Sequence, residues 1–337
     1  MSVPLPDAAP TNWVDRWAPE GLRPWLKLGR FDRPAGIWLL MLPGWQGIAL
    51  ACAAGGRWPN VWLMALFAVG ACAMRAAGCA WNDVVDRDLD RRVARTAERP
   101  VASGRISRKA AVAYAAALTA IGAAVLLFLP PVCTALALFS LLLVAAYPFM
   151  KRITWWPQAW LGLTFNWGAL MGFAATTAVG LLDWVGMGSP LTLGEQWPYW
   201  SGGMARAAGL MWPSAILLYA SGVFWTLGYD TIYAAQDLED DALVGVKSST
   251  RRLGARAPLG VAAFYAATIV LAGAAGFAAS LGPLCSVGLL LYAGHLGWQA
   301  LRFRLGDGPA ALRLFKSNRD AGLILVVALA AGLWRGM

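Results

Sequence analysis

Long apolar stretches recur along the whole chain, and each has the length that a helix needs to cross a lipid bilayer. Such a helix takes about 20 predominantly apolar residues. Only 14% of the 337 residues are charged, whereas a soluble domain carries roughly a quarter. We therefore predict an all-α, polytopic membrane protein with nine transmembrane helices, at residues 35–54, 61–81, 110–129, 131–149, 158–182, 209–232, 258–280, 283–303 and 320–335.

Arginine and lysine are concentrated in every second loop of this scheme, after the second, fourth, sixth and eighth spans. Basic residues collect on the cytoplasmic side of membrane proteins, so we expect a cytoplasmic N-terminus. Eight or ten spans would break the alternation. The first residues show no transit pattern rich in Arg and Ser, so we predict a multi-pass protein of a bacterial inner membrane, with its active site on the cytoplasmic side.

The remaining composition excludes several other classes. The net charge of +10 is better explained by orientation of the loops than by a nucleic-acid partner, so we predict membrane lipid and no nucleic acid. The five cysteines form no CxxC pair and His295 is the only histidine, which predicts packing residues and not a zinc site. Residues 1–34 place tryptophans among basic residues, which predicts an amphipathic surface segment ahead of a transmembrane domain at 35–337. Within that domain, 183–208 is predicted to be a long outer interfacial loop.

The densest polar cluster follows the second span and reads Asn-Asp-Val-Val-Asp-Arg-Asp-Leu-Asp from Asn82 to Asp90. In a continuous helix Asn82, Asp86 and Asp90 share one face, at i, i+4 and i+8. Asp83 lies close to that face. Asp88 points away and is expected to pair with nearby arginines.

A second acidic cluster, at residues 236–241, follows the sixth span, and Asp237 and Asp241 share a face there. Like charges at this spacing weaken a helix, so two such clusters indicate a function. Magnesium prefers carboxylate oxygens together with substrate phosphates. We predict that the two faces hold Mg²⁺ ions that bridge a diphosphate. The alternative is that both clusters are solvated helix ends with ion pairs inside each helix.

Basic residues surround both clusters and are candidates for contacts to phosphate oxygens, which arginine can bind in a bidentate manner. These candidates are Arg87, Arg91, Arg92, Arg95 and Arg99 beside the first cluster, and Lys247, Arg251 and Arg252 after the second. Arg87, Arg95 and Lys247 are the ones that we assign to the diphosphate. The alternative for many basic residues here is that they only orient the chain in the membrane.

Two ionisable residues lie deeper, because Arg75 precedes Asn82 by seven residues and Asp230 precedes Asp237 by the same interval. Charges inside a membrane are costly and usually face a polar cavity. We therefore predict that both line one pocket with the aspartates, a structural Arg–carboxylate pair being the alternative.

Three residues at the end of the fourth span form a further candidate group. Tyr147 and Lys151 stand at i and i+4, and Arg152 is adjacent. They are candidates for binding the diphosphate or an anionic co-substrate. The alternative is an interfacial tyrosine with orienting charges.

At these motifs the chain resembles the UbiA family of membrane prenyltransferases, over roughly residues 30 to 330. The resemblance rests on Asn82-Asp83-x-x-Asp86-Arg87-Asp88-x-Asp90, Arg95-Thr96-x-x-Arg99-Pro100, Tyr147-Pro148-Phe149-Met150-Lys151-Arg152, Tyr229-Asp230-Thr231 and Asp237-x-x-x-Asp241. Within the family, the run from Tyr147 to Arg152 and the run Arg30-Phe31-Asp32-Arg33-Pro34 are most similar to the branch that prenylates 4-hydroxybenzoate. The Trp155–Trp156 pair and the loop at 183–208 depart from the family pattern.

The resemblance implies nine helices around a central cavity that opens sideways to lipid. It implies that Mg²⁺ is bound, through the diphosphate of a polyprenyl diphosphate, by Asn82, Asp86, Asp90, Asp237 and Asp241. By the same resemblance Lys151 and Tyr147 help to hold the diphosphate, and Arg152 is a candidate for the acceptor carboxylate. We add Arg75, from the deeper pocket, as a second candidate for the acceptor.

The implied reaction transfers a polyprenyl group to the ring carbon ortho to the hydroxyl of 4-hydroxybenzoate, in ubiquinone biosynthesis. Asp230 and Asp83 are the candidates for taking the ring proton. Two alternatives stay open. An ion-coupled transporter would place its carboxylates near the bilayer midplane, whereas these clusters lie at cytoplasmic helix ends. A family member with another acceptor (homogentisate, a naphthoate or haem) would be separated by offering each acceptor to the purified enzyme.

Overall fold

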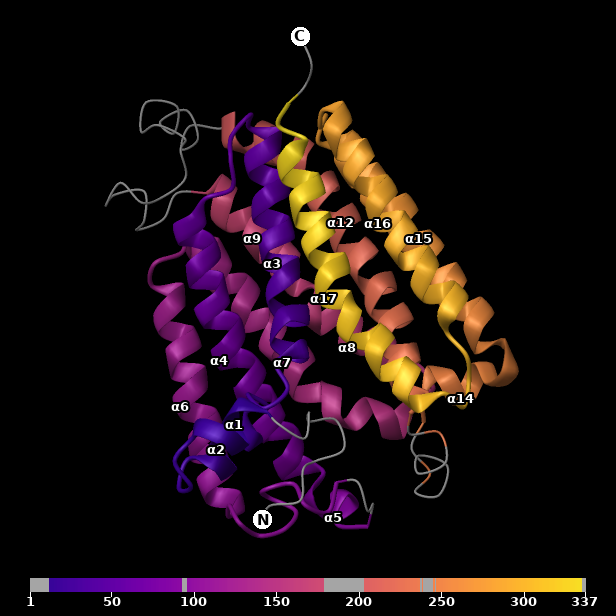
Figure 1. Ribbon diagram of the computed structural model, residues 1–337. Helices are drawn as coiled ribbons and strands as arrows, with labels where there is room; N and C mark the ends of the chain where they lie inside the picture. Colours follow the sequence, from indigo (N-terminus) through magenta and orange to yellow (C-terminus); the bar gives the residue numbers. More distant parts are fainter. Residues whose placement is uncertain are drawn as a thin grey trace.

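The computed structural model describes residues 12–92, 96–178, 203–236, 238, 245 and 247–334. These residues form a bundle of long helices, and no β-strand occurs in this part of the chain (Figure 1). The elements are α1 Trp13–Trp17, α2 Arg23–Leu28, α3 Ala35–Ala54, α4 Val61–Val85, α5 Arg87–Asp90, α6 Arg108–Leu126, α7 Pro131–Ile153, α8 Pro157–Phe165, α9 Trp167–Thr177, α12 Gly203–Ala234, α14 Ser249–Leu253, η1 Gly254–Arg256, α15 Ala257–Ala278, α16 Pro283–Arg302 and α17 Gly308–Ala331.

Six of the helical segments in the described ranges are long and apolar enough to cross a membrane. They are α3, α4, α6, α7, the segment from α14 to the end of α15, and α16. The spans predicted at these six places are therefore confirmed. The other three predicted spans fall on α8 with α9, on α12 and on α17, which are not among the six, so the count of nine is not confirmed.

The predicted span at 158–182 is corrected to two helices, because Asn166 interrupts it. The side-chain Nδ2 of Asn166 donates to the carbonyl oxygen of Gly162 at 2.9 Å and to Thr226 Oγ1 on α12 at 2.8 Å. Gly222 on α12 leaves room for this side chain, since a Cβ there would collide with it. An asparagine that bonds the backbone of its own helix competes with the regular turn, and α8 ends at the residue before it.

The last span is also corrected, because α17 begins at Gly308 and not near residue 320. Asp307 caps the helix by accepting a hydrogen bond from the backbone N–H of Ala310 at 2.9 Å. The first turns of α17 carry Arg313, Lys316 and Arg319. A prediction based on apolar runs misses such an amphipathic start, although the cap is a regular helix signal.

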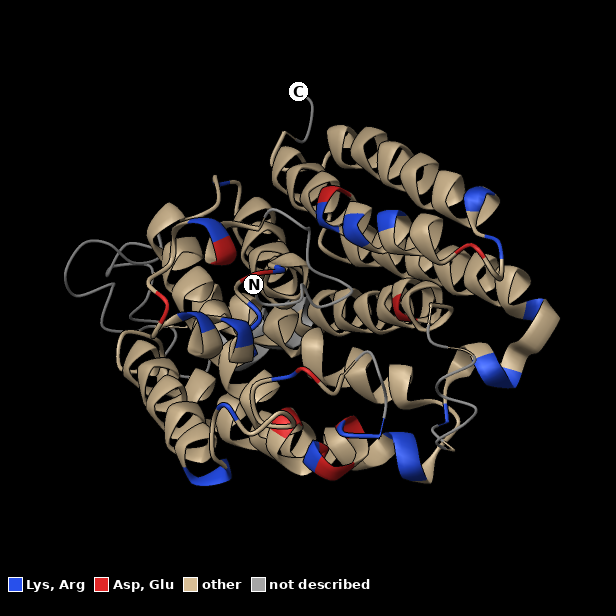
Figure 2. Cartoon of the chain, turned by 60° about the horizontal axis from the view of Figure 1, so that its bottom comes forward, with Lys and Arg blue, Asp and Glu red and all other residues tan. Residues whose placement is uncertain are grey.

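One end of the bundle carries the short elements and most of the charge. The helices α1, α2 and α5 lie at the bottom in Figure 1, and α14 lies at the lower right. Figure 2 brings that end forward and shows Lys, Arg, Asp and Glu mainly at helix ends and in loops, with few along the middle parts of the helices. We call this end the basic end, and its position agrees with the loop charges in the sequence.

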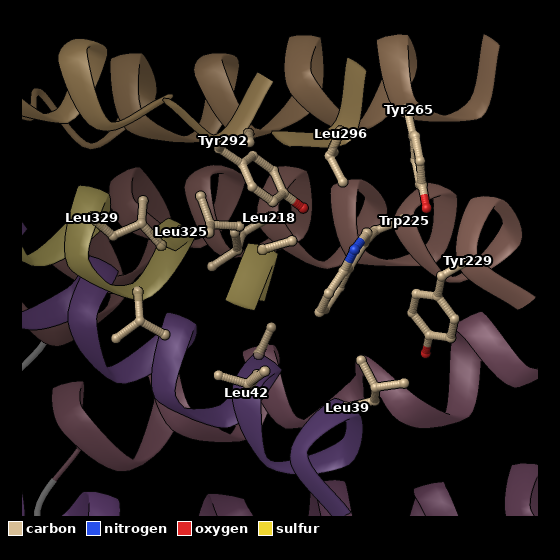
Figure 3. Close-up of a cluster of buried hydrophobic side chains, with 14 of the residues drawn as sticks. Leu39, Leu42, Leu218, Trp225, Tyr229, Tyr265, Tyr292, Leu296, Leu325 and Leu329 are labelled. Carbon is tan, nitrogen blue, oxygen red and sulfur yellow. The ribbon is translucent and has the colours of Figure 1, made fainter. Parts of the chain in front are cut away.

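The core of one half of the bundle lies between α3, α12, α15, α16 and α17 (Figure 3). Several of its buried polar groups bond one another: Trp225 donates to Asn318 Oδ1 at 2.8 Å, and Asn318 and Tyr265 both donate to Gln299 Oε1. Hydrogen bonds between helices stabilise membrane bundles because lipid offers no partners. This half therefore provides a fixed wall, and Tyr229 lies at its edge.

The N-terminal segment is folded onto the basic end. Lys27 of α2 pairs with Asp15 of α1 at 2.7 Å, and the indole of Trp13 donates to the carbonyl of Phe31 at 2.8 Å. Trp17 is 79% exposed, as a side chain at a membrane surface would be. The amphipathic surface role of residues 1–34 stays a prediction, and the loop predicted at 183–208 lies almost wholly outside the described residues.

Glycines let α3 and α9 approach each other closely. A Cβ at Gly172 on α9 would collide with the carbonyl oxygen of Gly44 on α3, and a Cβ at Gly47 would collide with that of Ala169. Small residues at helix crossings are a regular means of close packing in membranes. Because the obstructing atoms belong to the backbone, neither helix can yield without moving as a whole.

We predict that Gly172→Ala lowers stability by about 1–3 kcal/mol through overpacking of this crossing. The matched control is Gly273→Ala on α15, where a Cβ would meet no atom within 4 Å. There the helix preference for alanine predicts a gain of up to about 1 kcal/mol. Thermal unfolding of the purified protein in detergent measures both. Equal stability of the two variants would contradict the close crossing.

Candidate functional site

A cavity of about 510 Å³ lies between α3, α4, α6, α7, α8, α9, α12 and α17. Its end nearest the basic end of the bundle is lined by charged and polar side chains, including Arg30, Arg33, Asn82, Asp83, Arg99, Asp230 and Lys316. Its body is lined by apolar side chains, including Leu66, Phe67, Val125, Leu126, Leu141 and Met171. The cavity therefore has a polar end for an ionic group and an apolar body for a hydrocarbon chain.

The first acidic cluster is divided between two helices, because α4 ends at Val85 and α5 begins at Arg87. The backbone still connects its members: Asp86 N–H donates to Asn82 O, and Asp90 N–H donates to Asp86 O, both at 2.8 Å. Asp83, Asp86 and Asp90 are all buried. Their carboxylates pair with cations from other parts of the chain, and of the three only Asp83 lines the cavity. The single face predicted for one continuous helix is therefore not what holds them.

Asp83 and Asp90 share one arginine, whose side chain is 20% exposed. Arg99 Nη1 lies 2.9 Å from Asp90 Oδ2 and 3.4 Å from Asp83 Oδ1. Arg30 approaches the same Asp83 oxygen to 2.7 Å. Through Arg99, the two aspartates hold the loop after α5 against the end of α4. Through Arg30, Asp83 also holds the segment before α3 there.

The electrostatics of this network follow from its burial. Burial raises the pKa of Asp90 above its ordinary value, while Arg99 opposes the shift and Asp83 and Asp86 add to it. Burial alone would lower the pKa of Arg99, but Asp83 and Asp90 outweigh it and raise that pKa. Arg99 therefore stays charged, and its charge is what allows two carboxylates to be buried side by side.

Asp86 has a separate set of partners. Its two carboxylate oxygens accept hydrogen bonds from Lys151 Nζ and from Arg152 Nη2 at the end of α7, the latter at 3.2 Å. The structure thereby joins two motifs that are far apart in the sequence. Tyr147, one turn before Lys151, lines the cavity, whereas the Arg152 side chain is 49% exposed and lies outside the lining.

Arg75 and Asp230 both line the cavity. The guanidinium of Arg75 lies 5.4 Å from the centre of the Phe165 ring, and its Nε is buried without a hydrogen-bond partner. Gly36 on α3 gives it space, since a Cβ there would meet Arg75 at 2.6 Å. Arg75 therefore has donor capacity left inside the cavity.

Other candidates from the sequence lie elsewhere. Lys247 donates to the carbonyl of Ile153 at 3.0 Å, which caps the end of α7. Arg87 is half-buried and does not line the cavity. Asp88 is exposed and pairs with Arg108 at 2.8 Å, as we expected of a side chain that points away. Arg95, Asp237 and Asp241 lie outside the described residues, and the roles of all these residues stay predictions.

Sequence reasoning missed three cations of the cavity, Arg30, Arg33 and Lys316, whereas Arg99 was already a candidate for a phosphate contact. Arg30 and Arg33 stand in the run from Arg30 to Pro34 that carried the family resemblance, but no role was assigned to them. Lys316 gave no signal, because we expected the last span to begin after it.

The residues at the polar end can be tested for a magnesium site. No three Asp, Glu, His or Cys side chains converge on one metal position among the described residues. Magnesium commonly takes only one or two carboxylates and completes its shell with phosphates and water. Asn82 and Asp83 offer oxygens at the cavity, and Asp83 Oδ2 is buried without a hydrogen-bond partner. This donor set fits Mg²⁺ that is bound together with a diphosphate.

Comparison with known proteins agrees with these features. The family model described as the UbiA prenyltransferase family matches residues 40–324. The 4-hydroxybenzoate polyprenyltransferase of Arabidopsis thaliana is 40% identical over 95% of this chain and 71% of its own length. The protein of the same name from Homo sapiens is 38% identical over 94% of this chain and 78% of its own length.

Solved structures show the same fold. A UbiA homolog from Aeropyrum pernix aligns with a TM-score of 0.64 at 26% identity, covering 86% of this chain and 96% of the homolog. A UbiA homolog from Archaeoglobus fulgidus, bound to DMAPP and Mg²⁺, aligns with a TM-score of 0.63 at 18% identity, covering 91% of this chain and 97% of that one.

The predicted bacterial inner membrane is contradicted by these relatives, which are named as mitochondrial enzymes of eukaryotes. Alternating loop charges orient a chain within a membrane, but they do not say which membrane it is. The composition of the first residues was too weak a guide to that choice. A multi-pass membrane location stands, and the cytoplasmic orientation of the basic end stays a prediction.

We predict that Arg99→Met destabilises the protein by about 3–5 kcal/mol, because removing one member of a buried ion pair leaves its partners uncompensated. The matched control is Arg105→Met in the same loop. Arg105 pairs with Glu98 at 2.6 Å, but both side chains are nearly half exposed. Such a pair contributes about 0–1 kcal/mol. Thermal unfolding in detergent compares the two, and similar losses would contradict the special position of Arg99.

Proposed function

The chain belongs to the UbiA prenyltransferase family, and we propose that it transfers a polyprenyl group from a polyprenyl diphosphate to 4-hydroxybenzoate, in ubiquinone biosynthesis. The new bond forms at the ring carbon ortho to the hydroxyl. The observation that carries the reaction is one cavity with a charged end and a long apolar body. The acceptor is supported by the shared name of relatives that are 38–40% identical over most of the chain.

The diphosphate is proposed to bind at the polar end. The residues that would hold Mg²⁺ there are Asn82, which lines the cavity, Asp86 and Asp90, which follow it outside the lining, and Asp237 and Asp241. The bound ion would act as a Lewis acid that neutralises charge on the leaving diphosphate. Tyr147 lines the cavity and Lys151 lies one turn beyond it, in contact with Asp86. This contact places a lysine beside a proposed metal ligand, where a diphosphate would meet both.

The cavity cations supply the remaining positive charge. Arg30 and Arg99 are already fixed by Asp83 and Asp90, so they need little reorganisation to face developing negative charge. Fixed donors of this kind stabilise a leaving anion more than mobile ones do. Arg87, Arg95 and Lys247 belong to the same proposal from the sequence, although Lys247 already caps α7.

The bond to the diphosphate breaks as the allylic carbon acquires positive charge, and the phenol ring attacks that carbon. Water would capture the same carbon, so the apolar body of the cavity protects the reaction by excluding it. Aromatic faces attract positive charge, and Phe165 and Tyr147 are among the lining residues.

We assign the acceptor carboxylate to Arg75 in preference to Arg152. Arg75 is inside the cavity and has an unused donor. Arg152 lies outside the lining and contacts Asp86. We assign the ring proton to Asp230, which lines the cavity, because Asp83 is already held by two arginines.

We predict that Asp86→Asn and Asp237→Asn each lower prenyl transfer by about 100-fold or more, since each removes a proposed metal ligand. Asp88→Asn is the matched control, because this carboxylate is in the same cluster but is exposed and paired with Arg108. It should keep activity within about twofold. The assay uses purified membranes, 4-hydroxybenzoate, a polyprenyl diphosphate and Mg²⁺.

Activity that survives in either Asp86→Asn or Asp237→Asn would remove that cluster from the proposed site. A wild type that is intact but inactive with 4-hydroxybenzoate would be offered homogentisate and a naphthoate. Turnover of one of these would keep the family chemistry and overturn the proposed acceptor.

A further inference from the structure

One face of α4 forms a continuous wall of the cavity. Besides Leu66 and Trp81, the residues of α4 that line the cavity are Phe67, Gly70, Ala71, Met74, Arg75, Gly78, Cys79, Asn82 and Asp83. They recur at intervals of three and four, as one face of a helix requires. Seven of these nine positions carry a side chain, and the two glycines leave two gaps in the wall.

The gap at Gly78 is not needed for helix packing. At other glycines of this protein a neighbouring side chain occupies the place of the missing Cβ. A Cβ at Gly36 would meet Arg75, and a Cβ at Gly122 would meet Met74. A Cβ at Gly78 would meet no atom within 4 Å. Glycine is among the least favourable residues in a helix interior, so neither packing nor helix stability explains it.

The place of this gap is defined by its neighbours on the same face. Gly78 lies three residues after Arg75 and four residues before Asn82, so it stands between the residue assigned to the acceptor carboxylate and one assigned to the metal and diphosphate. Seven residues of helix span about 10 Å. An acceptor whose carboxylate is held at Arg75 must extend its ring along this interval to reach the carbon that leaves the diphosphate.

We propose that Gly78 is a specificity-determining residue, whose missing side chain makes the space for the acceptor ring. This inference rests on the proposed function and deepens it, because it locates the ring against one wall of the cavity. It also defines the acceptor class: a flat aromatic ring with a carboxylate, and with limited bulk on the edge that faces α4.

The second gap supplies a matched comparison. Gly70 lies eight residues before Gly78 on the same face, beside Phe67 and Val125 in the apolar body. A Cβ there would lie 3.8 Å from Val125 Cγ1, which is ordinary contact. A larger residue at Gly70 should therefore narrow the space for the prenyl chain and leave the space for the ring unchanged.

The experiment measures KM for each substrate in Gly78→Val, Gly70→Val and Gly273→Val. Gly78→Val should raise KM for 4-hydroxybenzoate by about tenfold or more, with KM for the polyprenyl diphosphate within about threefold. Gly70→Val should show the reverse pattern. Gly273→Val, at an open position on α15 outside the cavity, controls for valine in a helix and should change neither value.

Two further measurements protect the test against a folding defect. Thermal stabilisation by the polyprenyl diphosphate with Mg²⁺ should persist in Gly78→Val. The milder Gly78→Ala should reduce turnover of 3-methoxy-4-hydroxybenzoate about tenfold more than turnover of 4-hydroxybenzoate.

An unchanged KM for 4-hydroxybenzoate in Gly78→Val overturns the proposal, and so does loss of stabilisation by the diphosphate substrate in that variant. Equal effects of Gly78→Ala on the two acceptors overturn it as well. A wild type that prenylates none of these acceptors refutes the proposed function itself, which is a different result because it appears before any substitution is made.

Discussion

The buried carboxylates at the end of α4, and the basic side chains that neutralise them, are the contacts on which the site depends. Asp83 and Asp86 have no exposed side-chain surface, yet each is matched by two cations from other parts of the chain. Removing one member of such a buried set costs several times more than breaking an exposed pair. The same charges that fix α2, α4, α7 and the loop after α5 to one another are therefore those that would meet a diphosphate.

Arg30 shows how this arrangement is achieved locally. Its backbone adopts φ of 61°, a left-handed conformation that costs a residue with a side chain about 1–2 kcal/mol. The guanidinium compensates for this strain by donating to the carbonyl of Lys27 and to Asp83, at 3.0 and 2.7 Å. Because Lys27 also pairs with Asp15, the surface helices α1 and α2 are connected through one strained residue to the polar end of the cavity. Strain of this kind is held at functional sites by the contacts around it.

Sequence patterns predicted the parts of this protein that repeat a simple physical rule. Lipid demands long apolar helices, so six spans were predicted close to observed helices, and the basic loops gave the correct end for the first acidic cluster. Side-chain exceptions to the rule were missed: Asn166 divides one span by bonding its own helix, and Asp307 starts α17 among charged residues. The ion-pair partners of the aspartates could not be predicted either. Helix spacing placed Asp86 and Asp90 on one face, whereas in the fold Asp86 pairs with Lys151 and Asp90 pairs with Arg99. Helical periodicity predicts which residues share a face, but not which residues of other helices pack against that face.

The cavity has one polar and one apolar region, and its proposed substrate has one polar and one apolar part. A diphosphate needs cations and oxygens, and these lie at the basic end of the bundle, while a polyprenyl chain needs an apolar body, which α4, α6 and α7 supply. Leu138 and Leu141 of α7 line that body and are also exposed on the outside of the bundle, so the hydrocarbon space reaches the lipid-facing surface. The acceptor fits neither region fully, since it combines an apolar aromatic ring with a charged carboxylate. A ring of this kind requires its own place between the two regions, and α4 offers one where Arg75, the gap at Gly78 and Asn82 follow one another along a single face.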